Sequence, residues 1–210
     1  MRVYGMQLDE GTLREGVRVL INRDPDLAAV VRRYGAPPLW ARPPGFPTLI
    51  RIILEQQVSL SSAKATYDRL ETRIGVPEPD AFLTLHDAEL KVIGFSRQKT
   101  QYVRLLAESL RNGSFNLDEI ERFSDEEARI RLMELKGIGY WSADIYLLIA
   151  LRRPDVWPRG DLALVNAVAK IKGLPAPPSS EEFQSIGEAW RPWRSVAARI
   201  AWFEYLGGIP

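Results

Sequence analysis

The 210-residue sequence contains no cysteine and only one histidine, His86. Without cysteine, the chain cannot form disulfides, thiolate zinc sites or cysteine-ligated iron–sulfur clusters. A single histidine likewise excludes a histidine-rich metal site.

Long apolar runs and excess charge are also missing. No apolar run approaches the roughly 20 residues that span a membrane, and the start, Met1-Arg2-Val3-Tyr4, lacks a signal-peptide stretch. We therefore expect a soluble cytoplasmic protein, associated with the nucleoid if it is bacterial, that contacts no membrane. The net charge of +1 does not indicate nucleic-acid binding, yet it does not exclude it, because main-chain amides bind phosphate without side-chain charge.

Apolar residues make up 46% of the chain, enough for a sizeable core in one or two domains. They recur at helical spacing along most of the sequence, and no long linker interrupts them. We expect an all-α protein. The segments that bear on the site are expected helices at about 48–58, 63–74 (capped by Ser61-Ser62), 97–111, 125–133, 162–172 and 192–206, together with a second hairpin helix that contains the apolar run 145–151.

A glycine-rich turn between two expected helices is the most informative motif. It reads LKGIGYWSA (residues 135–143), and Asp161 follows twenty residues after Trp141. Glycines such as Gly137 and Gly139 tolerate a positive φ, and without a Cβ the backbone can approach a partner closely. The amide N–H groups that begin the second helix point into the turn and favour an anion, phosphate above all.

This arrangement resembles the helix-hairpin-helix DNA glycosylase superfamily, in which a Gly- or Pro-rich loop follows the hairpin and ends in a catalytic aspartate. Here that loop is VWPRGD (residues 156–161). Within the superfamily, the chain is most similar to the bacterial 3-methyladenine DNA glycosylase II family. The resemblance runs from about Pro47 to Gly208, and three further segments match in order: ILEQQVS (53–59), GFSRQK (94–99) and WRPWRS (190–195).

The resemblance implies two helical lobes with a DNA-binding cleft and a helix-hairpin-helix motif. Residues 1–210 would form one glycosylase unit, with one lobe from about 1–59 plus 156–210 and the other from about 60–155. Larger relatives carry an extra N-terminal β-containing domain, which we expect to be absent here. We also expect a monomer, without the iron–sulfur cluster that other branches of the superfamily hold.

Asp161 stands at the family's catalytic position. Hydrolysis of an N-glycosidic bond develops positive charge on the sugar. A nearby carboxylate stabilises that charge and can orient the attacking water. Asp is also a preferred N-cap, and Asp161 precedes the helix expected from Leu162. The capping and catalytic interpretations are compatible.

The residue at position 141 distinguishes two kinds of glycosylase in the superfamily. Bifunctional relatives carry a lysine there, which attacks the sugar, forms a Schiff base and leads to strand cleavage. This chain has Trp141, and its nearest lysine, Lys136, lies on the other side of the turn. Water remains as the nucleophile, so we expect an intact abasic strand and no lyase activity.

Aromatic side chains are expected to receive the damaged base, because a base must leave the duplex before it is cut. Trp141 and Trp202 align with the family's pocket tryptophans, and Tyr140 is a further candidate. An indole face attracts a cationic alkylated purine by ~0.5–2 kcal/mol. Core packing is equally compatible with Trp202 and is the expectation for Trp190 and Trp193. Weaker pocket candidates are Phe95, Tyr102, Trp40 and Trp157.

Gln56 and Gln57 interrupt the end of an apolar helix. Two adjacent amides are compatible with a solvated helix terminus. In the family, however, this segment supplies the side chain that fills the gap left by the flipped nucleotide. The matching residue is Gln57, where some relatives carry leucine, and its amide can also hydrogen-bond the orphaned base. Gln56 and Gln57 thus join Gly137 and Gly139 as the expected DNA-binding residues.

Hairpins of this family bind a monovalent cation, Na⁺ or K⁺, through main-chain oxygens. By alignment these oxygens belong to Met133, Leu135 and Ile138, and no other cofactor is expected. Basic residues that are compatible with either phosphate contacts or a solvated surface are Arg97, Lys99, Arg152 and Arg153.

The leading hypothesis is a monofunctional glycosylase that excises alkylated purines, such as 3-methyladenine and 7-methylguanine, from damaged double-stranded DNA in base excision repair. One alternative is the same fold acting on deaminated or other damaged bases, since aromatic walls accept many purines. The other is a non-catalytic hairpin protein that binds DNA. The carboxylate of Asp161 argues against a non-catalytic protein, because a negative charge does not help to bind a polyanion.

Overall fold

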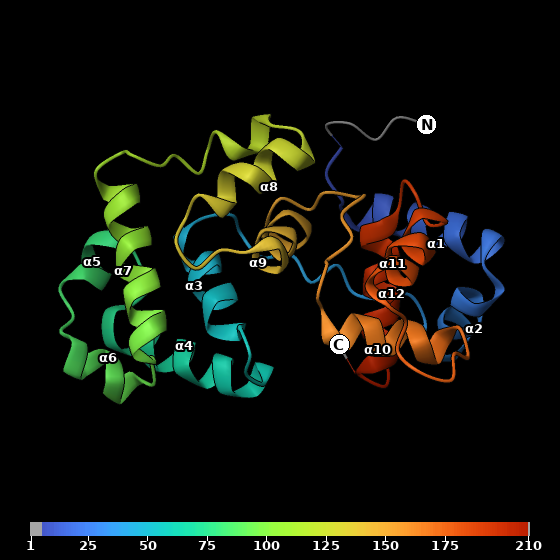
Figure 1. Ribbon diagram of the computed structural model, residues 1–210, viewed down its shortest axis with the longest axis horizontal. Coiled ribbons are helices and arrows are strands. Elements are labelled where there is room, and N and C mark those ends of the chain that lie inside the picture. The colour runs from blue at the N-terminus through green and yellow to red at the C-terminus, as the bar shows by residue number, and fades with distance from the viewer. Residues whose placement is uncertain (1–5, 210) are drawn as a thin grey trace. The chain divides into compact units, whose positions relative to one another are not determined.

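Helices form the regular secondary structure of residues 6–209, the part of the chain that the computed structural model describes, and no strand occurs there (Figure 1). The expected all-α fold is confirmed. The chain divides into two compact units, which we call the terminal unit (residues 1–41 and 147–210) and the hairpin unit (residues 42–146). No helix in the described part of the chain has the length and apolar character needed to cross a bilayer.

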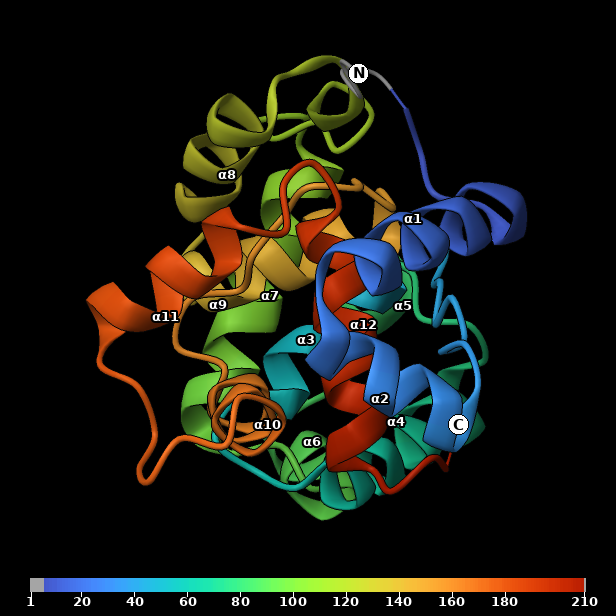
Figure 2. The same cartoon turned by 90° about the vertical axis from the view of Figure 1, so that its right-hand side faces the viewer.

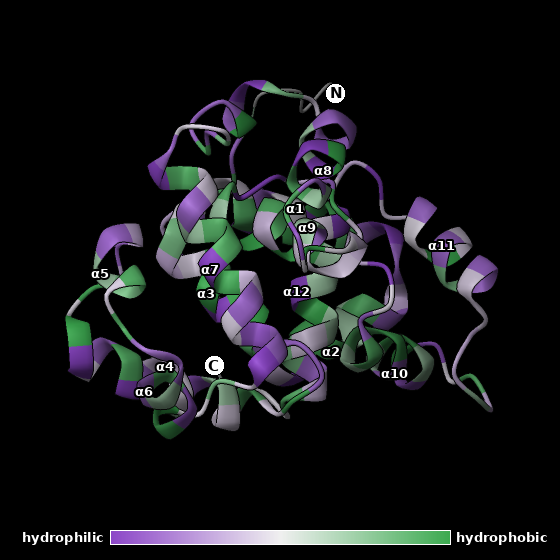
Figure 3. Cartoon of the chain, turned by 60° about the vertical axis from the view of Figure 1, so that its left-hand side comes forward, coloured by the Kyte–Doolittle hydropathy of each residue, from purple (hydrophilic) through white to green (hydrophobic). Residues whose placement is uncertain are grey.

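The terminal unit is built around α12 (Arg194–Tyr205), which packs against α1, α2 and α10. Figure 2 shows the red α12 behind the blue helices α1 and α2. Every residue of α12 from Ser195 to Ala201 is buried, so this helix supplies much of the unit's core. Helix α10 is also largely apolar (Figure 3). The surrounding helices are α1 (Glu10–Arg23), α2 (Pro25–Tyr34), α10 (Leu162–Ile171) and α11 (Ser180–Glu188).

A buried arginine on α12 links distant parts of the terminal unit. Arg199 donates hydrogen bonds to the carbonyl oxygens of Leu39 (2.7 Å), Leu148 (2.9 Å) and Ser195 (3.0 Å). Because burial removes water from the guanidinium group, the pKa of Arg199 falls to about 9. The three carbonyls replace that water, and they attach the loop at Leu39 and the segment at Leu148 to α12.

The hairpin unit has α3 (Phe46–Glu55) at its centre, where it packs against α4, α7 and α9. Seven of its ten residues are buried, which accounts for its strongly apolar sequence. The other elements of this unit are α4 (Leu60–Ile74), α5 (Pro79–Leu83), α6 (Asp87–Ile93), α7 (Arg97–Arg111), η1 (Ile120–Arg122), α8 (Asp125–Met133) and α9 (Tyr140–Ile145).

The unit boundaries lie earlier than the expected 59/60 and 155/156. They fall at 41/42 and 146/147. Helix α3 belongs to the hairpin unit because it packs against α4 and α7. The segment after Leu147 belongs to the terminal unit because its carbonyls are bonded there: Leu8 N donates to Arg152 O (2.7 Å), and Ser195 N donates to Pro154 O (3.0 Å).

Three helices differ from their expected form. The helix expected at 48–58 is α3, which ends at Glu55 with Gln56 as its C-cap. Helix α4 begins at Leu60 rather than Ala63, because Ser59 caps it by accepting a hydrogen bond from Ser62 N at 3.2 Å. The apolar run after α9 is not a plain α-helix but the π-helix η2 (Tyr146–Ala150). Its first residue, Tyr146, accepts a hydrogen bond at Oη from Gly45 N (3.0 Å), and burial raises the pKa of Tyr146 to about 12.

Candidate active site

The turn between α8 and α9 needs only one of its glycines for backbone conformation. Gly137 has a φ of 90°, whereas Gly139, the N-cap residue of α9, has a φ of −103°, which any residue adopts. The Ile138 N–H donates to the Leu135 carbonyl at 3.0 Å and closes the turn. The expected helix–turn–helix is confirmed, but a positive φ is required at Gly137 alone.

Packing makes a second demand on Gly137. A Cβ at this position would lie 2.3 Å from Cδ2 of Tyr102, whose ring covers the turn from α7. Tyr102, expected as a weak pocket candidate, therefore supports the hairpin, and its Oη accepts a hydrogen bond from Gln98 Nε2 at 2.6 Å. Around Gly139, by contrast, a Cβ would meet no described atom within 4 Å beyond its chain neighbours. The side of the turn that is open to a ligand is the side at Gly139.

A buried ion pair fastens the two hairpin helices. Arg129 on α8 donates from Nε to Oδ1 of Asp144 on α9 at 2.6 Å, and both residues are buried. Arg129 also pairs with Glu126. Removing one partner from such a pair leaves an uncompensated buried charge, at a cost of about 3–5 kcal/mol. The pairing of α8 with α9 is thus fixed within the protein.

Main-chain carbonyls of the hairpin retain capacity for a cation. In the described part of the chain, no hydrogen bond reaches the carbonyls of Met133 or Ile138, and the Leu135 carbonyl accepts one. A carbonyl oxygen has two lone pairs, so all three can still bind a hard cation. Binding of a monovalent cation by these carbonyls stays a prediction that the resemblance implies.

The two adjacent glutamines have different environments. Gln56, the C-cap of α3, donates from Nε2 to the Gly137 carbonyl (2.8 Å) and to Ser142 Oγ (2.9 Å). Gln57 is exposed and has a φ of 57°, which is uncommon outside glycine. The amide of Gln56, expected at DNA, is thus engaged within the protein, and Gln57 is the glutamine presented to solvent.

Lys99 is also engaged within the protein rather than extended toward solvent. Its Nζ donates to the carbonyls of Leu54 (2.7 Å) and Gln56 (2.9 Å), at the C-terminal end of α3. Burial lowers the pKa of Lys99. Lys99 was compatible with either a phosphate contact or a solvated surface, and the structure gives it a third role: its charge stabilises a helix end, which favours cations.

Asp161 forms the N-cap of α10, which confirms the capping interpretation of this residue. Its Oδ1 accepts hydrogen bonds from Leu164 N (2.8 Å) and, at longer distance, from Trp202 Nε1 (3.4 Å). Asp161 is 9% exposed, and Trp202, on α12, is half-buried. The fold thus joins two predicted site residues that are 41 positions apart in the sequence.

The loop that leads to Asp161 is fixed to the start of α12. Ser195 Oγ accepts a hydrogen bond from Val156 N (2.9 Å) and donates to Val156 O (3.2 Å). Arg194 donates from Nε to Asp155 Oδ1 at 2.9 Å. Motif WRPWRS, which contains both residues, therefore acts by holding the loop that carries the carboxylate.

Several aromatic residues belong to the core rather than to a pocket. Trp157 stacks on Phe183 with ring centroids 4.7 Å apart and donates from Nε1 to the Phe183 carbonyl. Phe95 is buried as well, so the weaker pocket assignments of Trp157 and Phe95 are wrong. Trp190 and Trp193 are buried, as expected.

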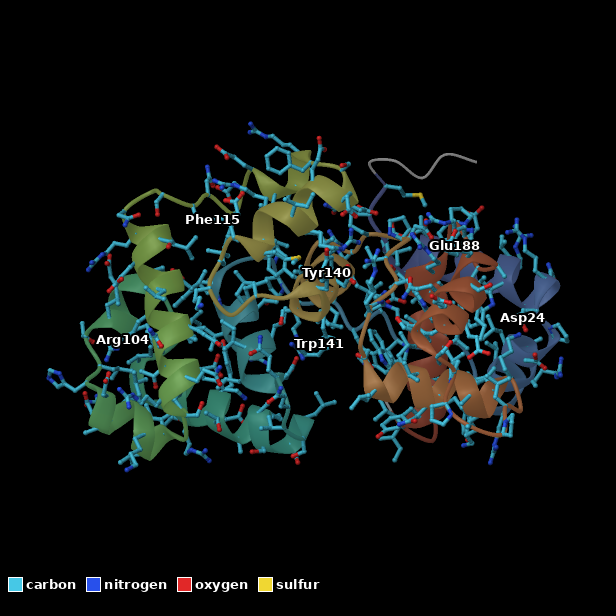
Figure 4. The ribbon with its side chains drawn as sticks, in the orientation of Figure 1. Asp24, Arg104, Phe115, Tyr140, Trp141 and Glu188 are labelled. Atoms are coloured by element: carbon cyan, nitrogen blue, oxygen red, sulfur yellow. The ribbon has the colours of Figure 1, made fainter. Side chains whose placement is uncertain are left out.

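Tyr140 and Trp141 are the first two residues of α9 (Figure 4). Tyr140 is about half exposed, and Trp141 is half-buried. Their role at a flipped base stays a prediction. The predicted residues thus form two groups, one in each unit: Gln56, Gln57 and the hairpin in one, Asp161 and Trp202 in the other.

The anchoring roles of Lys99 and Ser195 were not predicted from the sequence. Both lie within segments that carry the resemblance, GFSRQK and WRPWRS. Their location in these matching segments was the only sign in the sequence that they have a role. The sequence does not reveal which carbonyl or amide a lysine or a serine will bond.

A family of known proteins matches most of the chain, including the hairpin and Asp161. The model of the HhH-GPD superfamily of base excision DNA repair proteins matches residues 50–192. The chain belongs to this superfamily. The matched region of this HhH-GPD protein contains the hairpin, Gln57 and Asp161, whereas Trp202 lies beyond it.

Two curated relatives and one solved structure illustrate the similarity of this HhH-GPD protein. The putative DNA-3-methyladenine glycosylase YfjP of Bacillus subtilis is 26% identical, over 84% of this chain and 64% of the relative. DNA-3-methyladenine glycosylase 1 of Schizosaccharomyces pombe is 30% identical, over 73% of this chain and 69% of the relative. The structure of S. pombe Mag1 in complex with abasic DNA gives a TM-score of 0.81 at 28% identity, covering 90% of this chain and 95% of that one.

Proposed function

We propose that the chain is a monofunctional DNA glycosylase that hydrolyses the N-glycosidic bond of alkylated purines in double-stranded DNA. The observation that carries this proposal is the carboxylate of Asp161, which is buried at the start of α10 and bonded to the Trp202 indole. Binding the DNA polyanion gains nothing from this negative charge, and the cap on α10 does not need it either, because Asn caps a helix as well as Asp. The names of the relatives, 3-methyladenine glycosylases, support an alkylated purine as the substrate.

Asp161 supplies the electrostatic part of the reaction. Positive charge grows on the sugar as its bond to the base breaks, and a carboxylate shielded from water stabilises that charge more strongly than one in bulk water. Hydrogen bonds from Leu164 N and Trp202 Nε1 orient the carboxylate. Asp161 also orients the attacking water, and the products are a free base and an abasic strand.

Trp141, Trp202 and Tyr140 are the aromatic surfaces proposed to receive the flipped base. Purines such as 3-methyladenine and 7-methylguanine are cationic in DNA, and an indole face attracts a cation by ~0.5–2 kcal/mol. A cationic base is also a good leaving group, so no acid has to protonate it. The chain's one histidine, His86, is the N-cap residue of α6, and the proposed reaction does not use it.

The hairpin is the proposed contact with the DNA backbone. The open side of Gly139 allows a phosphate to approach the main chain, and main-chain contacts suit a protein with a net charge of +1. Met133, Leu135 and Ile138 would hold a monovalent cation through their carbonyl oxygens, and this ion would supply positive charge toward the phosphate. The hydrolysis itself uses water and requires no other cofactor.

Release of alkylated bases tests the proposed function directly. We expect the protein to liberate free 3-methyladenine and 7-methylguanine from methylated duplex DNA, as detected by chromatography of the released bases. Release of neither base, with DNA binding intact, would reject the proposal. A preference for neutral deaminated purines over every cationic base, in defined oligonucleotides, would favour the alternative substrate class.

The tryptophan at position 141 predicts hydrolysis without strand cleavage. Borohydride added during the reaction should trap no covalent protein–DNA adduct, because no lysine stands there to form a Schiff base. Gel electrophoresis of the mixture checks this, with a bifunctional glycosylase as the positive control. A trapped adduct with the wild-type chain would show that another amine, such as that of Lys136, reaches the sugar.

A further inference from the structure

The segment before Gln57 is fixed on two sides within the hairpin unit. On one side, Lys99 Nζ bonds the carbonyls of Leu54 and Gln56 at 2.7 and 2.9 Å. On the other side, Gln56 Nε2 bonds the Gly137 carbonyl and Ser142 Oγ at 2.8 and 2.9 Å. Helix α7 and the hairpin therefore both hydrogen-bond to the same short segment, Leu54 to Gln56, at the end of α3.

Gln57 follows this segment directly and has an unfavourable backbone conformation. Its φ of 57° lies in the left-handed region, and its side chain is exposed. A non-glycine residue stays in this region only where its surroundings hold it there. The bonds that Lys99 makes to the carbonyls of Leu54 and Gln56 are such a restraint, because they fix the chain where it enters Gln57.

We propose that Lys99 is a positioning residue, which holds Gln57 in the conformation that fills the gap left by the flipped nucleotide. The inference rests on the proposed function and on the gap-filling role that the resemblance implies for Gln57, because it assigns Lys99 a part in base flipping. Lys99 itself contacts neither base nor sugar. Its partial burial and the lowered pKa of its ammonium group agree with a charge used inside the protein.

The test compares duplex and single-stranded substrates in single-turnover excision of an alkylated purine. Extrusion from a duplex needs the gap to be filled, whereas a single strand has no paired stack to open. We expect Lys99→Met to slow duplex excision by roughly tenfold to a hundredfold and single-strand excision by less than about twofold. Equal losses on both substrates, or no loss on either, would overturn the proposal.

Matched variants separate positioning from charge and from folding. Lys91→Met removes an exposed lysine of α6 with the same change in charge and should leave both rates unchanged. Lys99→Arg retains a cation and should recover most of the duplex rate. If Lys99 acts through Gln57, adding Lys99→Met to Gln57→Ala should slow duplex excision no further than about twofold. A full multiplicative loss in the double variant would contradict the proposal.

A second readout needs no excision. A duplex with an abasic site and 2-aminopurine opposite it reports insertion into the gap through its fluorescence. The wild-type chain should change this fluorescence on binding, and Lys99→Met and Gln57→Ala should not. A wild-type change that persists in Lys99→Met would overturn the inference even if Lys99→Met is too unstable for kinetics. Absence of wild-type excision would instead count against the proposed function.

Discussion

Asp161→Asn should reduce the excision rate of 3-methyladenine by a factor of about 10² to 10³. The substitution removes the negative charge that faces the developing cation but keeps Oδ1, which accepts the hydrogen bonds from Leu164 N and Trp202 Nε1. Asn is as good an N-cap as Asp. The variant should therefore fold normally, and single-turnover assays on a defined lesion duplex measure the loss.

The matched measurement is DNA affinity. Fluorescence anisotropy should show that Asp161→Asn binds the lesion duplex at least as tightly as the wild-type chain, because a carboxylate near phosphates has been neutralised. Asp161→Ala serves as the control for the cap, since it removes charge and cap together. Full excision activity in Asp161→Asn would mean that Asp161 is a cap and nothing more.

Gly137→Ala should lower the melting temperature by roughly 6–12 °C, at about 2–4 °C per kcal/mol for a chain of this size. Two effects add up to a destabilisation of about 3 kcal/mol. An L-residue in the left-handed region costs ~1–2 kcal/mol, and overpacking costs ~1–3 kcal/mol, because the new Cβ would lie 2.3 Å from the ring of Tyr102. Circular dichroism during heating measures the shift.

Gly139→Ala is the control for this prediction. Its φ of −103° suits alanine, and a Cβ would meet no described atom within 4 Å outside the chain neighbours. Its melting temperature should therefore stay close to that of the wild-type chain, while its affinity for undamaged duplex falls because the Cβ occupies the side open to phosphate. Equal melting temperatures for both glycine variants would show that the Tyr102 ring can move aside to make room for a methyl group.

Helix positions followed from the sequence wherever an amphipathic pattern and a cap coincided. The helix expected at 97–111 is α7, bounded by Ser96 and Asn112. Where several residues can serve as cap, the pattern does not choose among them, and Ser59 rather than Ser61-Ser62 caps α4. The π-helix from Tyr146 to Ala150 leaves no sequence signal either, because an apolar run is compatible with both kinds of helix.

The roles of site residues were predictable where the backbone defines them. Gly137 and the cap at Asp161 follow from turn and helix geometry, which local sequence encodes. The partners of long side chains are decided by tertiary packing. Lys99 could equally have faced a phosphate, and Trp157 could equally have faced a base, until the neighbouring carbonyls and the ring of Phe183 were known.

The loop that ends in Asp161 is attached to one helix at both of its ends. Ser195, in the first turn of α12, holds Val156, and Trp202, seven residues further along α12, bonds Asp161. Seven helical residues span about 10 Å, and the loop has to bridge this distance with both attachments kept. Insertions and deletions between residues 157 and 160 would shift the loop against these attachments, so length variation in this protein should be more frequent in other connections, such as residues 173–178.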